Sequence, residues 1–159
     1  MKITFTLNGD RVTADVNPLK KLSDLLHDDY GLNSVHTSCR SGRCGMCTVI
    51  MEDEAYPSCL IPAFAVQDKS VLTLEGLREM KEFEDLTKAF NRTGYRPCEY
   101  CFPSKALLIY ALLLENLHPG ETEIMELMEA SACTCNVVNP LVRSIQIAAA
   151  YRRDSSYGR

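Results

Sequence analysis

The sequence predicts an α+β fold, with a β-sheet in the first half of the chain and helices in the second. Residues 2–7 alternate apolar and polar side chains, which is typical of a half-buried strand. From residue 85 onward, the apolar residues recur at helical spacing instead. The eight cysteines divide evenly between these halves. We therefore expect two domains, residues 1–76 and residues 77–159.

The first half reads as two strands, a helix, a long loop and further strands. Asn8-Gly9-Asp10 is a hairpin turn signal between strands over residues 2–7 and 12–16. Asn17-Pro18 favours a helix start, because Asn caps a helix N-terminus and Pro fits its first position. The apolar face of this helix would carry Leu19, Leu22, Leu25 and Leu26. With strands expected over 48–51, 55–58 and 70–74, this order is that of a β-grasp, plant-type ferredoxin-like domain.

The second half reads as a small four-helix domain. Strand patterning stops around residues 75–84, where charged residues dominate. Pro103 begins a helix whose middle is apolar on all sides, so we expect it to be a buried core element. Thr122 is placed to cap the next helix. The four expected helices cover 85–91, the region from Pro103 to 117, the region after Thr122, and the region after Asn139-Pro140, and 151–159 reads as a frayed polar tail.

The first cysteine set lies in one short loop and one separate segment. Its spacing is C-x4-C-x2-C followed by a distant cysteine, which is the plant-type pattern for a [2Fe–2S] cluster. Three thiolates can surround a small cluster only if the loop curls tightly, and Gly42 and Gly45 permit positive φ angles. The curl also turns backbone N–H groups toward cluster sulfur. The expected ligands are Cys39, Cys44, Cys47 and Cys59.

The second cysteine set has the pattern C-x2-C followed by C-x-C, and its members are Cys98, Cys101, Cys133 and Cys135. Four thiolates suit either Zn²⁺ or iron, so the residues alone leave both metals open here. Disulfides are disfavoured, because cysteines so close in sequence pair poorly and no signal-peptide segment precedes the first strand. The histidines, His27, His36 and His118, lie outside both sets, which gives no support to Rieske-type ligation.

Taken together, these motifs resemble the small iron–sulfur subunit of the xanthine oxidase family of molybdenum hydroxylases. The resemblance covers the chain from Ile3 to about Arg152. It rests on the loop CRSGRCGMCTV with its later cysteine, on Thr73-Leu74-Glu75-Gly76-Leu77, and on the C-x2-C that Pro103 follows. The C-x-C comes thirty-one residues after that motif.

The resemblance implies a ferredoxin-like N-terminal domain and a four-helix C-terminal domain, each holding one [2Fe–2S] cluster. It also implies two partners, a large molybdopterin subunit and an FAD-binding subunit, or a fused equivalent, in a hetero-oligomer. Electrons from substrate hydroxylation would pass from molybdenum through the helical-domain cluster and then the ferredoxin-domain cluster to FAD. In that scheme this chain binds no organic substrate.

The chain departs from the family pattern beside the second cysteine set. Where the family has Gln before the C-x2-C and Gly within it, this sequence has Pro97 and Glu99. The family also has Thr-Pro-Gly after that motif and Cys-Arg-Cys-Thr-Gly-Tyr at the last pair, whereas this chain has Phe102-Pro103-Ser104 and CTCNVV. In the family, that Gln and the last cysteine of the C-x-C reach the pterin. Because Pro97 has no side-chain donor or acceptor, only Cys135 would be left to make this contact.

Charges near the cysteines suggest how the two clusters would differ. A [2Fe–2S] core with four thiolates carries a formal charge of about −2, and reduction adds an electron. Arg40 and Arg43 beside the first cluster are therefore expected to raise its potential, and Glu99 to lower that of the second. Electrons would then run downhill from the helical domain to the ferredoxin domain.

Composition excludes several classes of function. The net charge of −4 gives no support to nucleic-acid binding, and the longest apolar run, residues 106–114, is too short to span a membrane. We find no Gly-rich phosphate loop and no nucleophile–base pair, so we predict no substrate chemistry within this chain. A cytoplasmic location is expected. Two alternatives remain: a stand-alone ferredoxin or redox-sensing module, and a zinc-stabilised scaffold.

Overall fold

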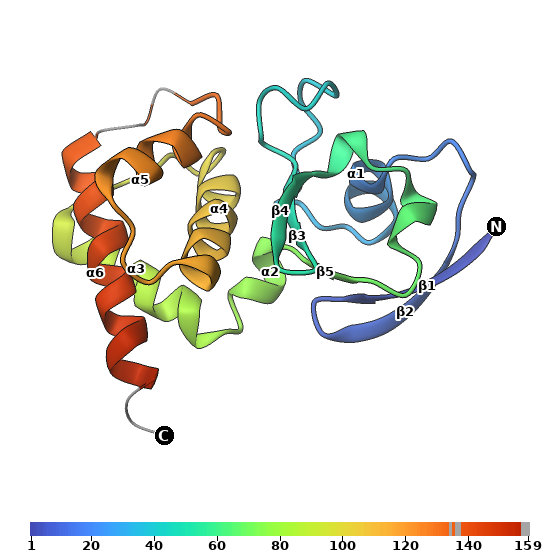
Figure 1. Ribbon diagram of the computed structural model, residues 1–159. Coiled ribbons are helices and arrows are strands. Elements are labelled where there is room, and N and C mark those ends of the chain that lie inside the picture. The colour runs from blue at the N-terminus through green and yellow to red at the C-terminus, as the bar shows by residue number, and fades with distance from the viewer. Residues whose placement is uncertain (134, 136–137, 157–159) are drawn as a thin grey trace.

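The computed structural model describes residues 1–133, 135 and 138–156. A five-stranded sheet occupies one side of the molecule, and the longer helices occupy the other (Figure 1). The strands are β1 (Lys2–Leu7), β2 (Asp10–Asp15), β3 (Thr48–Met51), β4 (Glu54–Pro57) and β5 (Ser70–Leu72). The α-helices are α1 (Leu22–Asp24), α2 (Leu74–Leu77), α3 (Lys81–Thr93), α4 (Phe102–Glu115), α5 (Glu121–Met128) and α6 (Val138–Ser156). The predicted α+β class is confirmed.

The sheet has the strand order β2-β1-β5-β3-β4. The central pair β1–β5 is parallel, whereas the other neighbouring strands are antiparallel. Ile3, Phe5 and Leu7 are buried, as the alternating pattern of β1 predicts. They pack with Leu22 and Leu25 from the first helical segment into a core of their own. The apolar face of the sheet is thus covered within the first half of the chain.

The predicted helix start at Asn17-Pro18 is wrong. The helix begins at Leu22 and continues as a π-helical turn, Leu25–Asp29. The Asn17 side chain accepts a hydrogen bond from the Leu19 amide at 2.9 Å, which makes a local turn instead of a helix cap. Leu19 is 88% exposed and does not share the buried face of this helix.

The helices of the second half also differ from the prediction at their ends. α3 begins at Lys81, four residues before the predicted start, and its charged first turn is part of the helix. Gly120 stands at the N-cap of α5, so Thr122 lies inside that helix and does not cap it. α6 continues to Ser156, and the frayed tail predicted from Tyr151 is wrong for the part that the structure describes. Residues 157–159 lie outside the described part.

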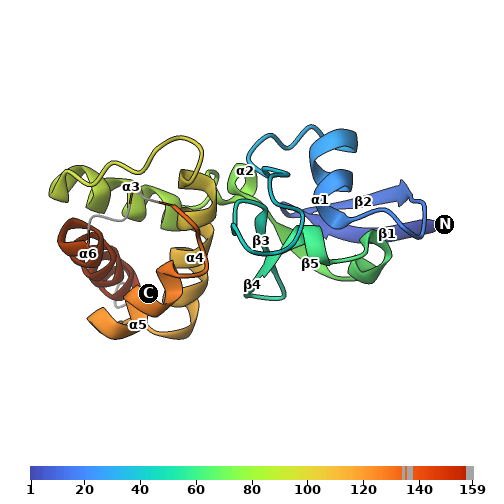
Figure 2. The ribbon, with the colours of Figure 1, turned by 90° about the horizontal axis from the view of Figure 1, so that it is seen from above.

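The two halves of the chain pack against each other through α4 and β3. The middle of α4 is buried as predicted, with Leu107, Leu108 and Ile109 in its core. Ile50 of β3 belongs to this helical core rather than to the core of the sheet. The short helix α2 lies between the two halves in both views (Figures 1 and 2). In the described part of the chain, no helix is both long and apolar enough to cross a membrane.

Candidate metal centres

The first cysteine loop curls as its glycines predict. Gly42 and Gly45 have φ angles of +74° and +71°. The Cys39 sulfur accepts hydrogen bonds from the backbone amides of Ser41 and Cys44, each at 3.4 Å. These amides lower the pKa of the exposed Cys39 thiol to about 5. The loop therefore presents N–H donors to a sulfur atom, as a cluster-binding loop requires.

Cys47 and Cys59 meet on the buried side of this loop. The Cys59 amide donates to the Cys47 sulfur at 3.5 Å. Ser58 holds the two segments together, because its hydroxyl donates to the Cys47 carbonyl at 2.7 Å and its amide to the same oxygen at 3.1 Å. Burial raises the pKa of the Cys59 thiol to about 11. The structure thus brings the fourth cysteine of the set to the loop across eleven intervening residues.

The second cysteine set forms a tighter group. The sulfur atoms of Cys98, Cys101, Cys133 and Cys135 all lie within 4.8 Å of one another. Among the residues that the structure describes, this is the one group of three or more possible metal ligands so closely spaced. The Cys101 amide donates to the Cys98 sulfur, and the Cys135 amide donates to the Cys133 sulfur, both at 3.4 Å. Four convergent sulfurs with amide donors suit a [2Fe–2S] cluster.

Helix α4 positions the first two of these thiols. The Cys98 carbonyl accepts the Phe102 amide at 2.9 Å, and Cys101 occupies the N-cap of α4. The positive end of a helix favours thiolates there. The Cys101 amide lowers the pKa of the Cys98 thiol to about 7, while burial raises the pKa of the Cys101 thiol. The two thiols of this pair therefore differ in how readily they ionise.

The two cysteine sets contact each other through their loops. The Ala132 amide donates a hydrogen bond to the Cys44 carbonyl at 3.0 Å. A Cβ atom on Gly45 would lie 2.1 Å from the carbonyl oxygen of Ala130, so only glycine fits this contact. The His36 ring stacks on the Tyr100 ring with 4.3 Å between centroids and an angle of 11° between planes. The sequence predicted the curl of the first loop, but not its contact with the second half.

Sequence reasoning missed one charged residue at the second site. Lys105 is completely buried one turn after Cys101, and its Nζ donates to the Tyr95 hydroxyl at 3.1 Å. That hydroxyl donates to the Cys135 carbonyl at 3.3 Å. A signal was present, because Lys105 is a charged residue directly before the apolar run of a helix that was predicted to be buried.

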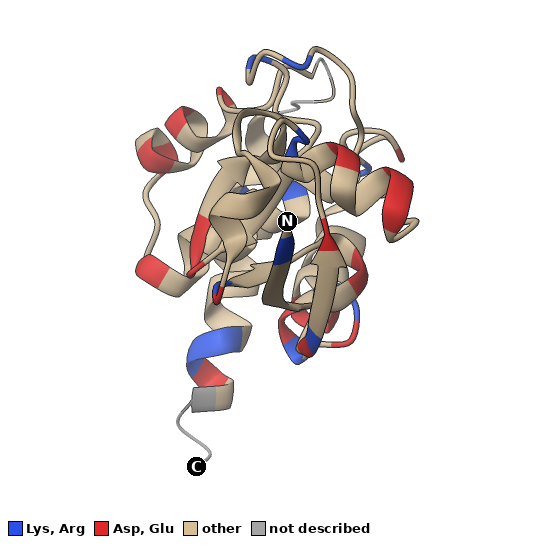
Figure 3. Ribbon diagram, turned by 90° about the vertical axis from the view of Figure 1, so that its right-hand side faces the viewer, with Lys and Arg blue, Asp and Glu red and all other residues tan. Residues whose placement is uncertain are grey.

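The charges that the sequence singled out lie at the surface. Arg40 is 64% exposed and forms an ion pair with Asp24 at 3.6 Å, and Arg43 and Glu99 are also exposed. Basic positions lie along the loop at the top of the view in Figure 3. Thr134 within the C-x-C, and Asn136 and Val137 after it, fall outside the described residues, so their departure from the family pattern has no structural account here.

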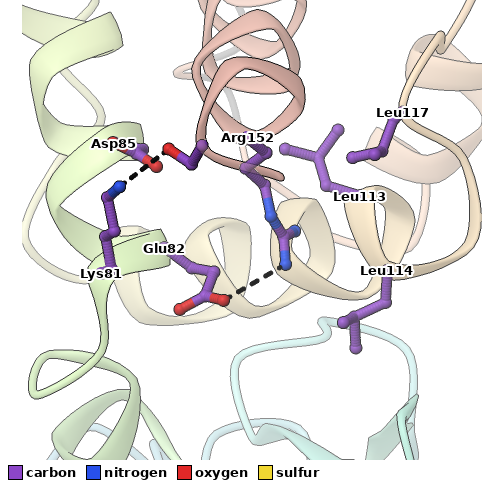
Figure 4. A pocket seen from close by; sticks show the side chains of 8 residues that line it. Lys81, Glu82, Asp85, Leu113, Leu114, Leu117 and Arg152 are labelled. Carbon is purple, nitrogen blue, oxygen red and sulfur yellow. Dashed lines mark hydrogen bonds and ion pairs between the residues drawn. The ribbon is translucent and has the colours of Figure 1, made fainter. Parts of the chain in front are cut away.

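A separate cavity of about 430 Å³ lies between α3 and the end of α6 (Figure 4). Its walls carry charges of both signs. Arg152 pairs with Glu82 at 3.7 Å, and the Lys81 ammonium donates to the Ser155 hydroxyl at 2.8 Å. Because these wall residues already interact with one another, we assign no ligand to this cavity.

Comparisons with known proteins match two families to this chain. Residues 5–75 match a family described as a 2Fe-2S iron-sulfur cluster binding domain, and residues 73–146 match a family described as a [2Fe-2S] binding domain.

Two relatives match over most of their own length. The nicotinate dehydrogenase small FeS subunit of Eubacterium barkeri is 36% identical over 84% of this chain and 85% of its own. A probable xanthine dehydrogenase subunit of Bacillus subtilis is 30% identical over 98% of this chain and 87% of its own. A chain in the crystal structure of quinoline 2-oxidoreductase from Pseudomonas putida 86 superposes with a TM-score of 0.85, at 29% identity and 96% coverage of each chain.

Proposed function

Since this chain belongs to the family of small iron–sulfur subunits of molybdenum hydroxylases, whose members are electron-transfer subunits of oxidoreductases, we propose that it relays electrons through two [2Fe–2S] clusters. In this proposal the electrons come from a molybdopterin centre in a large partner subunit and pass to FAD in another partner. The observation that carries the proposal is the hydrogen-bonded contact between two cysteine loops, each arranged to hold one cluster.

The proposed ligands are the two cysteine sets. Cys39, Cys44, Cys47 and Cys59 would hold one cluster in a ferredoxin-like domain of residues 1–76, and Cys98, Cys101, Cys133 and Cys135 would hold the other in a four-helix domain of residues 77–159. When bound, each cluster takes up and releases one electron at a time. The protein contributes thiolate ligands and backbone N–H groups directed at sulfur, seen at Cys39, Cys98 and Cys133.

The contact between the loops favours an electron relay rather than two sites that act independently. A path along the backbone from Cys44 to Cys133 includes a single hydrogen bond, from the Ala132 amide to the Cys44 carbonyl at 3.0 Å. Ala132 directly precedes Cys133. A short connection between two cysteine sets is what transfer of an electron from one to the other requires. A stand-alone ferredoxin needs only the first set.

Exposed apolar side chains beside the cysteines support the binding of large partner subunits at these surfaces. Tyr100, inside the C-x2-C, is 49% exposed, and Leu60, next to Cys59, is 53% exposed. Cys39 and Cys98 are also exposed. We propose that the molybdopterin and flavin subunits cover these two surfaces, which would shield the clusters from water.

Purification of the native complex tests this proposal. We expect the chain to be coloured and to co-purify with subunits that contain molybdopterin and FAD. The substrate of the complex should bleach the visible absorption of the clusters under anaerobic conditions. A coloured chain without partners would support the stand-alone redox module instead, and a colourless chain containing zinc would support the scaffold.

A further inference from the structure

A buried positive charge stands beside the second cysteine set. Lys105 is among the largest fully buried side chains of the protein, with 0% exposure. It lies one helical turn after Cys101, whose carbonyl accepts the Lys105 amide at 3.1 Å. An ammonium group in such a position is costly unless negative charge or strong hydrogen-bond acceptors surround it.

Tyr95 connects this ammonium group to the cysteines. The Lys105 Nζ donates to the Tyr95 hydroxyl at 3.1 Å and lies 5.8 Å from the centre of the Tyr95 ring. The hydroxyl in turn donates to the Cys135 carbonyl at 3.3 Å. Because the hydroxyl donates its proton in this bond, the phenol is neutral, and the positive charge of Lys105 is not cancelled there.

The other charges near the cysteine sets are in a different environment. Arg40, Arg43 and Glu99 are exposed, so water and salt screen them. Lys105 is shielded from solvent. In the protein interior, a charge is screened much less and acts over a longer distance. Among these four residues, Lys105 is therefore expected to have the strongest electrostatic effect on a cluster.

We propose that Lys105 is a potential-setting residue, whose positive charge raises the reduction potential of the cluster held by Cys98, Cys101, Cys133 and Cys135. This inference rests on the proposed function. One electron entering that cluster makes its formal charge one unit more negative. A nearby cation stabilises this reduced form more than the oxidised form, so the potential rises. The direction is opposite to the one expected from Glu99 alone.

This assignment changes the expected energetics of the relay. A higher potential at the second cluster favours transfer of an electron from the molybdenum centre to it. The same shift reduces the driving force of the next step, toward the first cluster. Lys105 would thus shift the equilibrium toward the state in which the second cluster is reduced and the first is oxidised.

The test is an EPR-monitored redox titration of the purified native complex and of its Lys105→Met variant. Met keeps a long unbranched side chain and removes the charge. We expect the equilibrium constant for reduction of the second cluster to fall at least tenfold, which is about 59 mV for one electron. The potential of the first cluster serves as an internal reference. The second cluster's signal is identified as the one that a Cys98→Ser variant lacks.

Two further variants separate charge from shape. Lys105→Gln is neutral but can still hydrogen-bond to Tyr95, and should give the same downward shift as Lys105→Met. Lys105→Arg keeps the charge and should stay near the wild-type potential. Glu99→Gln, which changes an exposed charge at the same site, should cause a smaller shift than either neutral variant.

Each outcome decides the inference. An unchanged second-cluster potential in a fully loaded Lys105→Met complex overturns it, while the proposed function stands. If both neutral variants lose the second cluster but Lys105→Arg keeps it, the charge is needed to bind the cluster rather than to set its potential, and the inference fails. If Lys105→Arg also loses the cluster, the requirement is for shape and the inference fails. A wild-type complex without two [2Fe–2S] signals refutes the proposed function itself.

Discussion

The backbone amide of Ala132 donates a hydrogen bond to the carbonyl oxygen of Cys44, with 3.0 Å between nitrogen and oxygen. This bond joins a residue of the first cysteine set to the residue directly before Cys133 of the second. Gly45, the next residue along the first loop, is buried against the backbone of Ala130. Two loops that are far apart in the sequence therefore behave as one structural unit.

Gly45→Ala is predicted to separate these loops. The new methyl group would lie 2.1 Å from the Ala130 carbonyl oxygen, and alanine is also strained at a φ of +71°. Overpacking of this kind costs about 1–3 kcal/mol, in addition to about 1 kcal/mol for the left-handed backbone conformation. Thermal or urea unfolding of the purified chain should show a loss equal to the sum of these two terms.

Gly31→Ala is the matched control for this variant. Gly31 has a similar φ of +65°, but a Cβ atom there would meet nothing within 4 Å. It should therefore lose only the backbone term. An equal loss of stability in the two variants would show that the contact between the loops contributes nothing.

Glu75 is predicted to make stability depend on pH. Burial alone would raise its pKa, but hydrogen bonds from Ser34 and Thr73 outweigh burial and lower it. The Ser34 amide and hydroxyl donate to this carboxylate at 3.0 and 2.6 Å, and the Thr73 hydroxyl donates at 2.7 Å. A lowered pKa in the folded state adds stability above the unfolded pKa, and this is lost as the pH falls through the folded pKa.

Glu75→Gln should therefore destabilise the protein by about 1 kcal/mol at pH 7. The difference from wild type should shrink as the pH falls below the ordinary carboxyl pKa of 4.5. Urea unfolding at pH 7 and at successively lower pH measures it. Glu79→Gln, an exposed position four residues further along, should have little effect at any pH. A constant difference between wild type and Glu75→Gln would refute the assignment.

Removal of single cysteines is predicted to affect the two sites separately. Cys59→Ser should remove the first cluster, because Cys59 is the ligand that ties the loop to a distant segment. Cys98→Ser should remove the second cluster and leave the first. Each variant should retain about half of the iron and one of the two EPR signals of the reduced protein. Simultaneous loss of both signals in either variant would mean that the sites do not form independently.

Much of the fold follows from local patterns in the sequence. The alternation in β1 and the apolar run in α4 predict buried elements that the structure contains. The predicted helix at Asn17 fails because its side chain bonds to a nearby amide, and propensity alone does not decide between a cap and a turn. The start of α3 was not predicted, because its first turn is mostly charged and its single apolar residue, Phe83, is too little to show a helical period.

At the cysteine sites too, local patterns were predictable and contacts between distant residues were not. Cysteine spacing predicts which thiols belong together, and the structure brings the second set within 4.8 Å. Contacts between residues distant in the sequence were not predictable from it, such as the fit of Gly45 against Ala130. The position of Lys105 in a helix predicted to be buried was a signal, but its contact with Tyr95 was not predictable, because it depends on how α4 is turned against its neighbours.

A metal and sulfide analysis of the purified chain, combined with EPR of its reduced form, shows whether one chain holds two [2Fe–2S] clusters. We expect about four iron atoms and four acid-labile sulfides per chain, two for each cluster, and two distinguishable signals. Zinc in place of iron, or about two iron atoms with a single signal, would contradict it.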